Sequence, residues 1–204
     1  MTKLYLISPS SVNISEFAVS LEEVLSTGLA SCFQLRLKDI NDQEIINISK
    51  VLKPICHKNN VAFILNDRLD LASIVGADGV HLGEDDGSIS DARKFLGPKA
   101  IIGASCYNSK HLAMEAAEKG ADYVAFGAFF ETKTKKAKTK AEISIIKDWV
   151  FISDVPCLAI GGIDPENCHE LVEAGVDFIA VVGSIWTSSD SPRNAIKNFK
   201  SIIV

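Results

Sequence analysis

Short apolar runs recur along the whole chain, and each is followed by a stretch with helical periodicity. Most of these runs are continuously apolar rather than alternating, which is typical of parallel strands buried on both faces. Parallel neighbours need crossover helices between them, so the pattern predicts an α/β fold. Eight strands are expected, at Lys3–Ser8, Cys32–Lys38, Val61–Asn66, Gly79–Leu82, Ala100–Ala104, Tyr123–Ala128, Cys157–Ile160 and Phe178–Val182.

The regular spacing of these units favours a closed sheet. Eight β/α units in 204 residues fit one (β/α)8 TIM barrel at the small end of its size range. An open doubly wound sheet is the alternative. No linker, low-complexity segment or change in charge divides the chain, so we expect a single barrel domain over residues 1–204.

Local signals mark where helices begin and end. A glycine followed two residues later by aspartate precedes a strand at 76–78, 120–122 and 175–177; the glycine should end a helix and the aspartate make a turn. Asn41 and Glu44 form a capping-box pattern. The pairs Asp164-Pro165 and Ser191-Pro192 each resemble an N-cap followed by proline in the first helical position.

Composition excludes several classes of function. The net charge of −5 gives no general electrostatic case for nucleic-acid binding. No apolar run approaches the roughly 18 residues that a membrane span needs, and the N-terminus lacks a signal-peptide cleavage pattern. Five cysteines, without a C-x-x-C motif, are typical of reduced thiols, so we expect a cytoplasmic protein that binds neither nucleic acid nor membrane.

In a barrel, functional groups lie where the strands end. Alternation along the second strand sends Gln34, Arg36 and Lys38 to one face, which in a closed barrel is the interior. Cations there are costly unless an anion compensates them. The alternative is a pair of cations near the rim, satisfied by carboxylates.

Carboxylates follow the third and fourth strands. Asp67 comes directly after one, and Asp85 and Asp86 come shortly after the other. Together they predict a site for an oxygen-loving cation such as Mg²⁺. Taken separately, Asp67 could be only a helix cap and Asp85-Asp86 only a loop turn.

Glycines after the last two strands predict a phosphate site. Gly161-Gly162 and Gly183-Ser184 allow main-chain N–H groups to approach an anion. The loop 133–140 alternates lysines with hydroxyl groups, which are phosphate-binding chemistry, although a solvated loop is the alternative. A long polar loop over a site can also close as a lid. His81 lies inside the fourth strand and is interpreted as structural, and no triad or zinc motif occurs.

Seven short motifs, in order along nearly the whole chain, resemble the thiamine phosphate synthase family. Each motif is short, but the ordered set is highly specific. They are Gln34-Leu35-Arg36-x-Lys38, Asn66-Asp67-Arg68-x-Asp70-Leu71-Ala72, Gly76-Ala77-Asp78-Gly79-Val80-His81-Leu82-Gly83, Ile102-Gly103-x-Ser105, Gly120-Ala121-Asp122-Tyr123, Thr132-x-Thr134-Lys135 and Ala159-Ile160-Gly161-Gly162-Ile163.

The resemblance implies a transferase that uses Mg²⁺ and two small-molecule substrates. The family joins 4-amino-2-methyl-5-hydroxymethylpyrimidine diphosphate to 4-methyl-5-hydroxyethylthiazole phosphate, giving thiamine phosphate and pyrophosphate. By resemblance, Asp67 and Asp86 hold the metal, and Gln34 lies near the pyrimidine. The catalytic residues that contact the diphosphate or the reacting region are Arg36, Lys38, Asn66, Ser105 and Lys135. The thiazole phosphate is held by Thr132, Thr134, Gly162, Val182 and Gly183.

Three positions depart from the family pattern. Glu84 stands where the family usually has glutamine, Gly183 where it usually has serine, and Tyr107 where a histidine often follows Ser105 by two residues. Choosing Asp86 rather than Asp85 as the second metal ligand depends on spacing alone.

Three other functions compete with this interpretation. A thiazole tautomerase on the same fold relies on a histidine near the position of Tyr107, and tyrosine is a poor base at neutral pH. A non-catalytic phosphate-binding barrel would not need Asp67, Asp86 or the cations of the second strand. A phosphosugar isomerase or epimerase would need a general base at a strand end, where the carboxylates are already assigned to the metal. Oligomeric state is not readable, although an apolar flank of the barrel could pair two copies.

Overall fold

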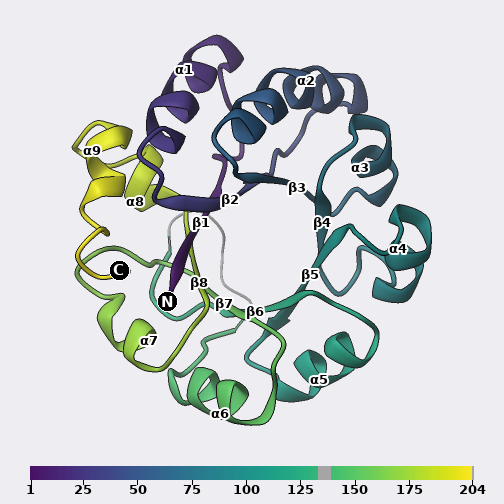
Figure 1. The fold of residues 1–204 in the computed structure, drawn as a ribbon, viewed down its shortest axis with the longest axis vertical. Helices are drawn as coiled ribbons and strands as arrows, with labels where there is room; N and C mark the ends of the chain where they lie inside the picture. The colour runs from purple at the N-terminus through teal and green to yellow at the C-terminus, as the bar shows by residue number, and fades with distance from the viewer. Residues whose placement is uncertain (133–138, 204) are drawn as a thin grey trace.

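The computed structural model describes residues 1–132 and 139–203. Within these ranges the strands are all parallel and close into a barrel in the order β1 to β8, as Figure 1 shows in a view down the barrel. The predicted (β/α)8 barrel is therefore confirmed. The strands are β1 Lys3–Ile7, β2 Ala30–Leu35, β3 Ala62–Asn66, β4 Gly79–Leu82, β5 Ile101–Tyr107, β6 Tyr123–Gly127, β7 Cys157–Ile160 and β8 Phe178–Val181.

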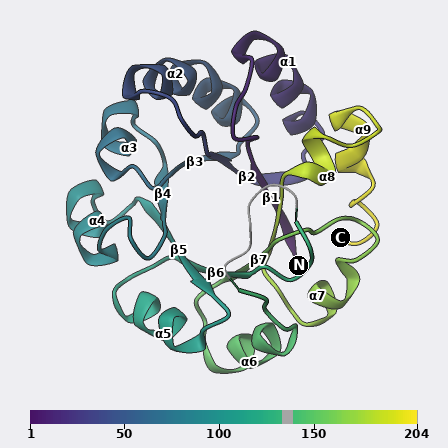
Figure 2. The same ribbon diagram turned by 180° about the vertical axis from the view of Figure 1, so that it is seen from behind.

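Helices follow the strands along the chain and form a ring around the barrel, which is clear from both ends in Figures 1 and 2. Two short helices, α8 and α9, follow the last strand and lie beside α1. The helices are α1 Ile14–Leu25, α2 Asp42–Lys58, α3 Leu69–Val75, α4 Ile89–Leu96, α5 Lys110–Glu118, α6 Ser144–Ile152, α7 His169–Glu173, α8 Gly183–Trp186 and α9 Pro192–Lys197.

The second strand ends earlier than predicted. It stops at Leu35, so only Gln34 of the three predicted inward residues belongs to it. Beyond it the main chain is held by Ser8 and Ser10: the N–H of Arg36 donates to Ser8 Oγ at 2.9 Å, and the N–H of Lys38 to the carbonyl of Ser10 at 3.0 Å. The prediction that alternation carries Arg36 and Lys38 into the interior is therefore wrong.

One helix start was also predicted wrongly. Asp164-Pro165 opens a turn, and α7 begins only at His169. The Asp164 carboxylate accepts from the N–H groups of Glu166 at 2.9 Å and Asn167 at 3.0 Å, so it does cap, but it caps the turn. The predicted proline start at Ser191-Pro192 is confirmed for α9.

The repeated aspartate pattern has a more specific role than a turn. Asp78 donates its main-chain N–H to the carbonyl of Phe63 at 2.9 Å, and its carboxylate accepts from the N–H of Phe63 at 2.7 Å. The carboxylate of Asp122 accepts from Ile102 in the same way, at 2.7 Å. Each aspartate therefore fastens the start of its own strand to the start of the neighbouring strand.

The core has two layers. A large apolar layer lies between the strands and the helices. A smaller layer fills the barrel, from side chains that alternate with the outward ones: Tyr5, Ile7, Cys32, Ile64, Tyr123, Ala125, Leu158 and Ala180. Tyr123 needs a glycine beside it, because a Cβ at Gly103 would lie 2.0 Å from its Cζ.

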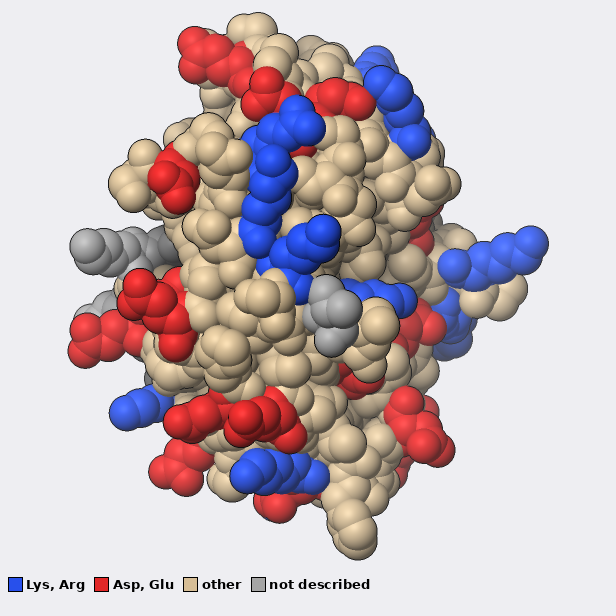
Figure 3. Space-filling view, turned by 60° about the vertical axis from the view of Figure 1, so that its left-hand side comes forward, with Lys and Arg blue, Asp and Glu red and all other residues tan. Residues whose placement is uncertain are grey.

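The surface carries both signs of charge. Figure 3 shows both signs on one flank of the barrel: several basic side chains lie against one another near the middle of this face, with acidic side chains above and below them. Among the helices that the structure describes, none is long and apolar enough to cross a membrane.

Candidate active site

A cavity of about 710 Å³ opens at the carboxyl ends of the strands, and the ends of all eight strands or the loops that follow them contribute to its wall. This is the end of a (β/α)8 barrel where catalytic groups gather. Every predicted site residue within the described ranges lines it: Gln34, Arg36, Lys38, Asn66, Asp67, Asp86, Ser105, Thr132, Gly162, Val182 and Gly183. Thr134 and Lys135 lie outside the described residues.

A second depression lies near the amino ends of the strands, where Ala62, Asp78 and Ile101 stand. None of the predicted site residues lines it. In this fold the amino end of the barrel serves stability rather than chemistry.

Two cations stand at the rim of the cavity after β2. Arg36 is half-buried and Lys38 is exposed, so neither charge lies in the core. Among the described residues, no carboxylate forms an ion pair with either of them. The alternative prediction was that carboxylates neutralise the two cations at the rim. Within the part of the chain that the structure describes, no carboxylate does so. The two cations are available to an anionic ligand.

Asp67 occupies a strained turn directly after β3. Its φ is +63°, which is uncommon for a residue other than glycine. The N–H of Arg68 donates to the carbonyl of Asn66 at 2.7 Å, which closes a three-residue γ-turn around Asp67. The N–H of Asp67 donates to the carbonyl of His81, at 2.8 Å, in β4. Strain of this kind persists only where surrounding contacts enforce it, and it clusters at functional sites.

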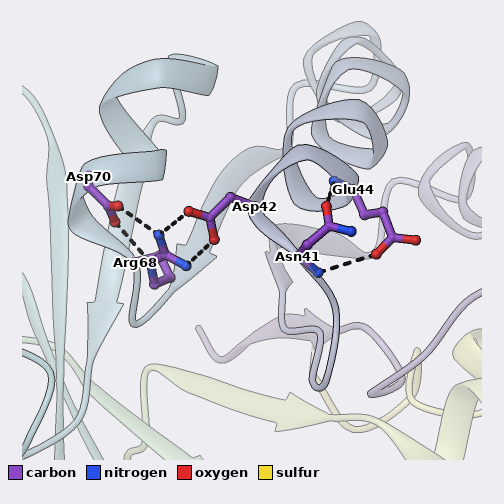
Figure 4. A network of polar contacts seen from close by, with 5 residues as sticks. All are labelled: Asn41, Asp42, Glu44, Arg68 and Asp70. Carbon is purple, nitrogen blue, oxygen red and sulfur yellow. Dashed lines mark hydrogen bonds and ion pairs between the residues drawn. The ribbon is translucent and has the colours of Figure 1, made fainter.

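Arg68 ties two loops of the site together, as Figure 4 shows. Its Nη1 and Nη2 donate to the two carboxylate oxygens of Asp42 at 2.6 and 2.9 Å, and its Nε and Nη2 donate to those of Asp70 at 3.0 and 2.7 Å. These hydrogen bonds lower the pKa of both carboxyl groups below their ordinary values. Asp42 begins α2 and Asp70 lies in α3, so the clamp joins the loop that carries Lys38 to the turn that carries Asp67.

The start of α2 is fixed by its own cap. Asn41 accepts from the N–H of Glu44 at 2.9 Å, and the Glu44 carboxylate accepts from the N–H of Asn41 at 3.2 Å, also drawn in Figure 4. The predicted capping box is therefore confirmed. It sets the position of Asp42, the first residue of the helix, and so supports the clamp.

Asp86 is exposed within the β4–α4 loop, which lines the cavity. One carboxylate oxygen accepts from the N–H of Gly83 at 2.9 Å, which leaves the other oxygen for a ligand. Among the described residues no group of three or more His, Cys, Asp or Glu side chains is placed to hold a metal ion. A pair of carboxylates still suits Mg²⁺, which keeps several waters and takes oxygens from substrate phosphates.

A chain of hydrogen bonds crosses the floor of the cavity inside the barrel. Gln34 Nε2 donates to the Tyr5 hydroxyl at 2.9 Å, and the hydroxyls of Tyr5 and Tyr123 are 2.8 Å apart. Tyr123 then contacts His81 Nδ1, and His81 Nε2 contacts Ser105 Oγ, both at 2.9 Å. Burial, chiefly, raises the pKa of both tyrosines well above the ordinary value. Sequence reasoning missed Tyr5 and Tyr123, because an aromatic residue in a strand is ordinarily part of the core.

The glycines after β7 have a packing role as well as the predicted one. Gly162 has φ +63°, and a Cβ there would lie 2.2 Å from the carbonyl oxygen of Glu131. The N–H of Phe130 donates to the carbonyl of Gly161 at 3.0 Å. The segment after β6 therefore lies directly on the β7 exit, which is possible only because side chains are missing there.

Ser184 contributes a hydroxyl group to the site. The sequence pointed to this residue only as part of the Gly183-Ser184 pair. Its Oγ is buried without a hydrogen-bond partner among the described residues, and the residue lines the cavity. Gly183 and Ser184 form the first turn of α8, where the helix itself supplies no acceptor for their N–H groups. A buried hydroxyl without a partner is costly, and an anionic ligand would satisfy it.

All three departures from the family pattern line the cavity. Glu84 is exposed at the rim. Tyr107 ends β5 with φ +56°, after a register shift between Ser105 and Tyr107. A Cβ at Gly183 would meet Thr187 Oγ1 at 3.3 Å, so a small side chain there needs only a slight adjustment.

A closed parallel barrel whose cavity combines cations, carboxylates and glycine-rich turns at the carboxyl ends of the strands is typical of a barrel enzyme that acts on small molecules. Comparison with known proteins specifies the class further. The family model described as thiamine monophosphate synthase matches residues 4–185. The thiamine-phosphate synthase of Rhodospirillum centenum is 47% identical over 201 residues, covering 98% of this chain and 97% of that protein.

Two further relatives agree. The thiamine-phosphate synthase of Erythrobacter litoralis is 47% identical over 203 residues, covering 97% of this chain and 93% of its own. The solved structure of thiamine phosphate pyrophosphorylase from Pyrococcus furiosus superposes with a TM-score of 0.85 at 34% identity, covering 98% of this chain and 95% of that one. The chain therefore belongs to the thiamine monophosphate synthase family, and it is a transferase of thiamine biosynthesis.

Proposed function

We propose that the protein joins 4-amino-2-methyl-5-hydroxymethylpyrimidine diphosphate to 4-methyl-5-hydroxyethylthiazole phosphate, with release of pyrophosphate. The observation that carries this assignment is one cavity that combines Arg36 and Lys38, which have no ion pair among the described residues, with Asp67 and Asp86. Cations alone would suit any anion. Cations together with two carboxylates suit a diphosphate that arrives with a divalent metal.

In this proposal the rim after β2, β3 and β4 binds the diphosphate. Arg36, Lys38 and Asn66 donate to its oxygens, and Asp67 and Asp86 hold Mg²⁺. When bound, Mg²⁺ supplies Lewis-acid stabilisation of the negative charge on the leaving diphosphate. The strained turn at Asp67 and the Arg68 clamp keep these donors in place before the substrate arrives, so little reorganisation accompanies the reaction.

The bond change requires no protein nucleophile. The carbon–oxygen bond to the diphosphate breaks, its electron pair leaves with pyrophosphate, and the thiazole nitrogen supplies the pair for the new carbon–nitrogen bond. The amino group of the pyrimidine delocalises the positive charge on the methylene carbon, so the step is dissociative. The protein's contribution is to orient the two rings and to stabilise the departing charge.

The thiazole phosphate is proposed to bind where β7 and β8 end. Gly162, Val182 and Gly183 offer main-chain contacts, and Ser184 offers its buried hydroxyl. Thr132 also lines the cavity, directly after Glu131, whose carbonyl lies against Gly162. By resemblance Thr134 and Lys135 also contact the phosphates; they lie outside the described residues.

The protein is proposed to work in the cytoplasm. All five cysteines are buried and free of disulfide bonds. Free thiols suit a reducing compartment such as the cytoplasm.

An end-point assay tests the reaction. Purified protein is mixed with both substrates, with Mg²⁺ or with EDTA, and thiamine phosphate and pyrophosphate are measured. We expect both products in equal amounts with Mg²⁺ and neither with EDTA. Isomerised thiazole phosphate without pyrophosphate would instead indicate the tautomerase, and binding of both ligands without any product would indicate a non-catalytic barrel.

A further inference from the structure

The hydrogen-bond chain inside the barrel contains three buried titratable groups that the proposed reaction does not use: Tyr5, Tyr123 and His81. We infer that all the hydrogen bonds in this series point the same way, each residue donating to the next from Gln34 to Ser105. In that direction the series fixes His81 as the Nε2–H tautomer and makes the Ser105 hydroxyl a hydrogen-bond donor to the cavity. The inference concerns the ligand-free protein, so it stands or falls independently of the proposed substrates.

The direction is set at the Gln34 end. The amide Nε2 donates to the Tyr5 oxygen at 2.9 Å, and Tyr5 is 2% exposed, so water does not serve this hydroxyl. Its proton must therefore go to a buried acceptor. The oxygen of Tyr123 is 2.8 Å away. The Cys32 thiol, which packs in the same cluster inside the barrel, is the other candidate, but sulfur is a weak acceptor.

The next link determines the state of the histidine. Tyr123 accepts from Tyr5, and its own proton then goes to His81 Nδ1, 2.9 Å away. A ring nitrogen that accepts a hydrogen bond carries no proton, so the proton of the neutral ring is on Nε2. The rings of His81 and Tyr123 are stacked with centroids 5.6 Å apart, which holds this geometry.

The opposite direction is poorly satisfied. Ser105 would donate to His81, His81 to Tyr123 and Tyr123 to Tyr5. The Tyr5 oxygen would then receive two donors, from Gln34 and Tyr123, and its own proton would be left to the thiol of Cys32. The chosen direction gives the protons of both tyrosines and of the histidine an oxygen or nitrogen acceptor, and each bond polarises the next.

The last link faces the cavity. His81 Nε2–H donates to Ser105 Oγ at 2.9 Å, and Ser105 is half-buried on the cavity wall. Since its oxygen is already engaged as an acceptor from the ring, the hydroxyl turns its proton to the cavity. The ligand atom that meets Ser105 must then be an acceptor, such as an oxyanion or an unprotonated ring nitrogen. Tyr5, Tyr123 and His81 are thus positioning residues.

Nitrogen NMR of the ligand-free protein labelled with ¹⁵N-histidine tests this direction. At pH 8, long-range proton–nitrogen correlations distinguish the two tautomers, and the missing signal in His81→Gln identifies His81 among the four histidines. We expect the Nε2–H tautomer. An Nδ1–H or doubly protonated ring would overturn the inference.

Two variants test which neighbour of His81 determines its tautomer. Tyr123→Phe keeps the ring but removes the donor to Nδ1, so the preference for Nε2–H should be lost. Ser105→Ala removes only the downstream partner, so the preference should remain. A switch of tautomer in Ser105→Ala would mean that the serine imposes the direction, and the inference would fail. If Tyr123→Phe does not fold, the spectra of the unmodified protein and of Ser105→Ala decide the question.

Discussion

The carboxylate of Asp177 accepts a hydrogen bond from the main-chain N–H of Cys157, at 2.8 Å, and the N–H of Asp177 donates to the carbonyl of the same residue, at 3.2 Å. The two bonds fasten the start of β8 to the start of β7 at the amino end of the barrel. Asp78 and Asp122 make the same carboxylate contact to their neighbouring strands.

This contact predicts a difference between two substitutions. Asp177→Ala leaves the N–H of Cys157 without its side-chain partner, which should lower the free energy of unfolding by about 1–3 kcal/mol. Asp177→Asn keeps an oxygen acceptor and should cost clearly less. Urea unfolding of both variants measures the difference, and equal losses would mean that charge rather than the hydrogen bond matters.

A second prediction concerns the space beside Tyr123. In Gly103→Ala the added Cβ would lie 2.0 Å from Tyr123 Cζ, so the buried ring must move. Overpacking of this kind costs about 1–3 kcal/mol. Thermal unfolding checks it, with Gly183→Ala as the control for stability because its added Cβ meets nothing closer than 3.3 Å. A Gly103→Ala protein as stable as that control would contradict the packing described for the barrel interior.

The metal ligands give a third prediction. Asp67→Ala and Asp86→Ala should each lower turnover by about two to three orders of magnitude, because electrostatic stabilisation of the leaving group is lost. Binding of Mn²⁺, followed by electron paramagnetic resonance, should weaken in parallel. Asp85→Ala should have a smaller effect on both measurements. If Asp85→Ala proves the more severe variant, the second ligand is Asp85.

The Arg68 clamp predicts how stability depends on pH. Hydrogen bonds from Arg68 lower the pKa of Asp42 and Asp70 in the folded protein. Their contribution to stability is therefore present above the unfolded pKa, about 3.9 for aspartate, and is lost as the pH falls through the lower folded value. The loss of stability in Arg68→Gln should be larger at pH 7 than at pH 2.5. Urea midpoints at both pH values test this, and a loss independent of pH would mean that Arg68 acts by packing alone.

The buried thiols give the last prediction. Burial raises the pKa of Cys106 and of Cys157 to about 12. A folded pKa above the unfolded value favours the folded state at low pH, so this stabilisation is complete below about pH 8.5 and is lost as the pH rises toward 12. At pH 8 the folded protein should react with a thiol reagent only as fast as it unfolds. Rapid labelling of native protein would show that a cysteine is accessible.

Sequence reasoning predicted the barrel well because its signals are local and repeated. Eight apolar runs with helical stretches between them determine the order of the elements. Strand ends were predicted less well, because Arg36 and Lys38 continue an apolar–polar alternation beyond Leu35 although their N–H groups bond to Ser8 and Ser10. A contact made by residues about 28 positions away leaves no mark in the local pattern.

The candidate site was predicted in part for the same reason. Residues with distinctive chemistry at strand ends, such as Asp67 and Ser105, do line one cavity. The residues that hold them were missed. Arg68 and Tyr123 contact partners that are distant in sequence, Asp42 and His81. Their neighbours along the chain look the same as those of an ordinary surface arginine and an ordinary core tyrosine, so these contacts could not be predicted.

The floor of the cavity is built from the same side chains that fill the barrel, Tyr5 and Leu158 among them. A change that adapts this floor to a different ligand also alters the packing that keeps the strands together. Changes at the rim, where Glu84 and Lys38 are exposed, carry no such penalty. Evolution and protein engineering can therefore vary specificity in this barrel far more freely through its loops than through its floor, which should be inherited almost intact.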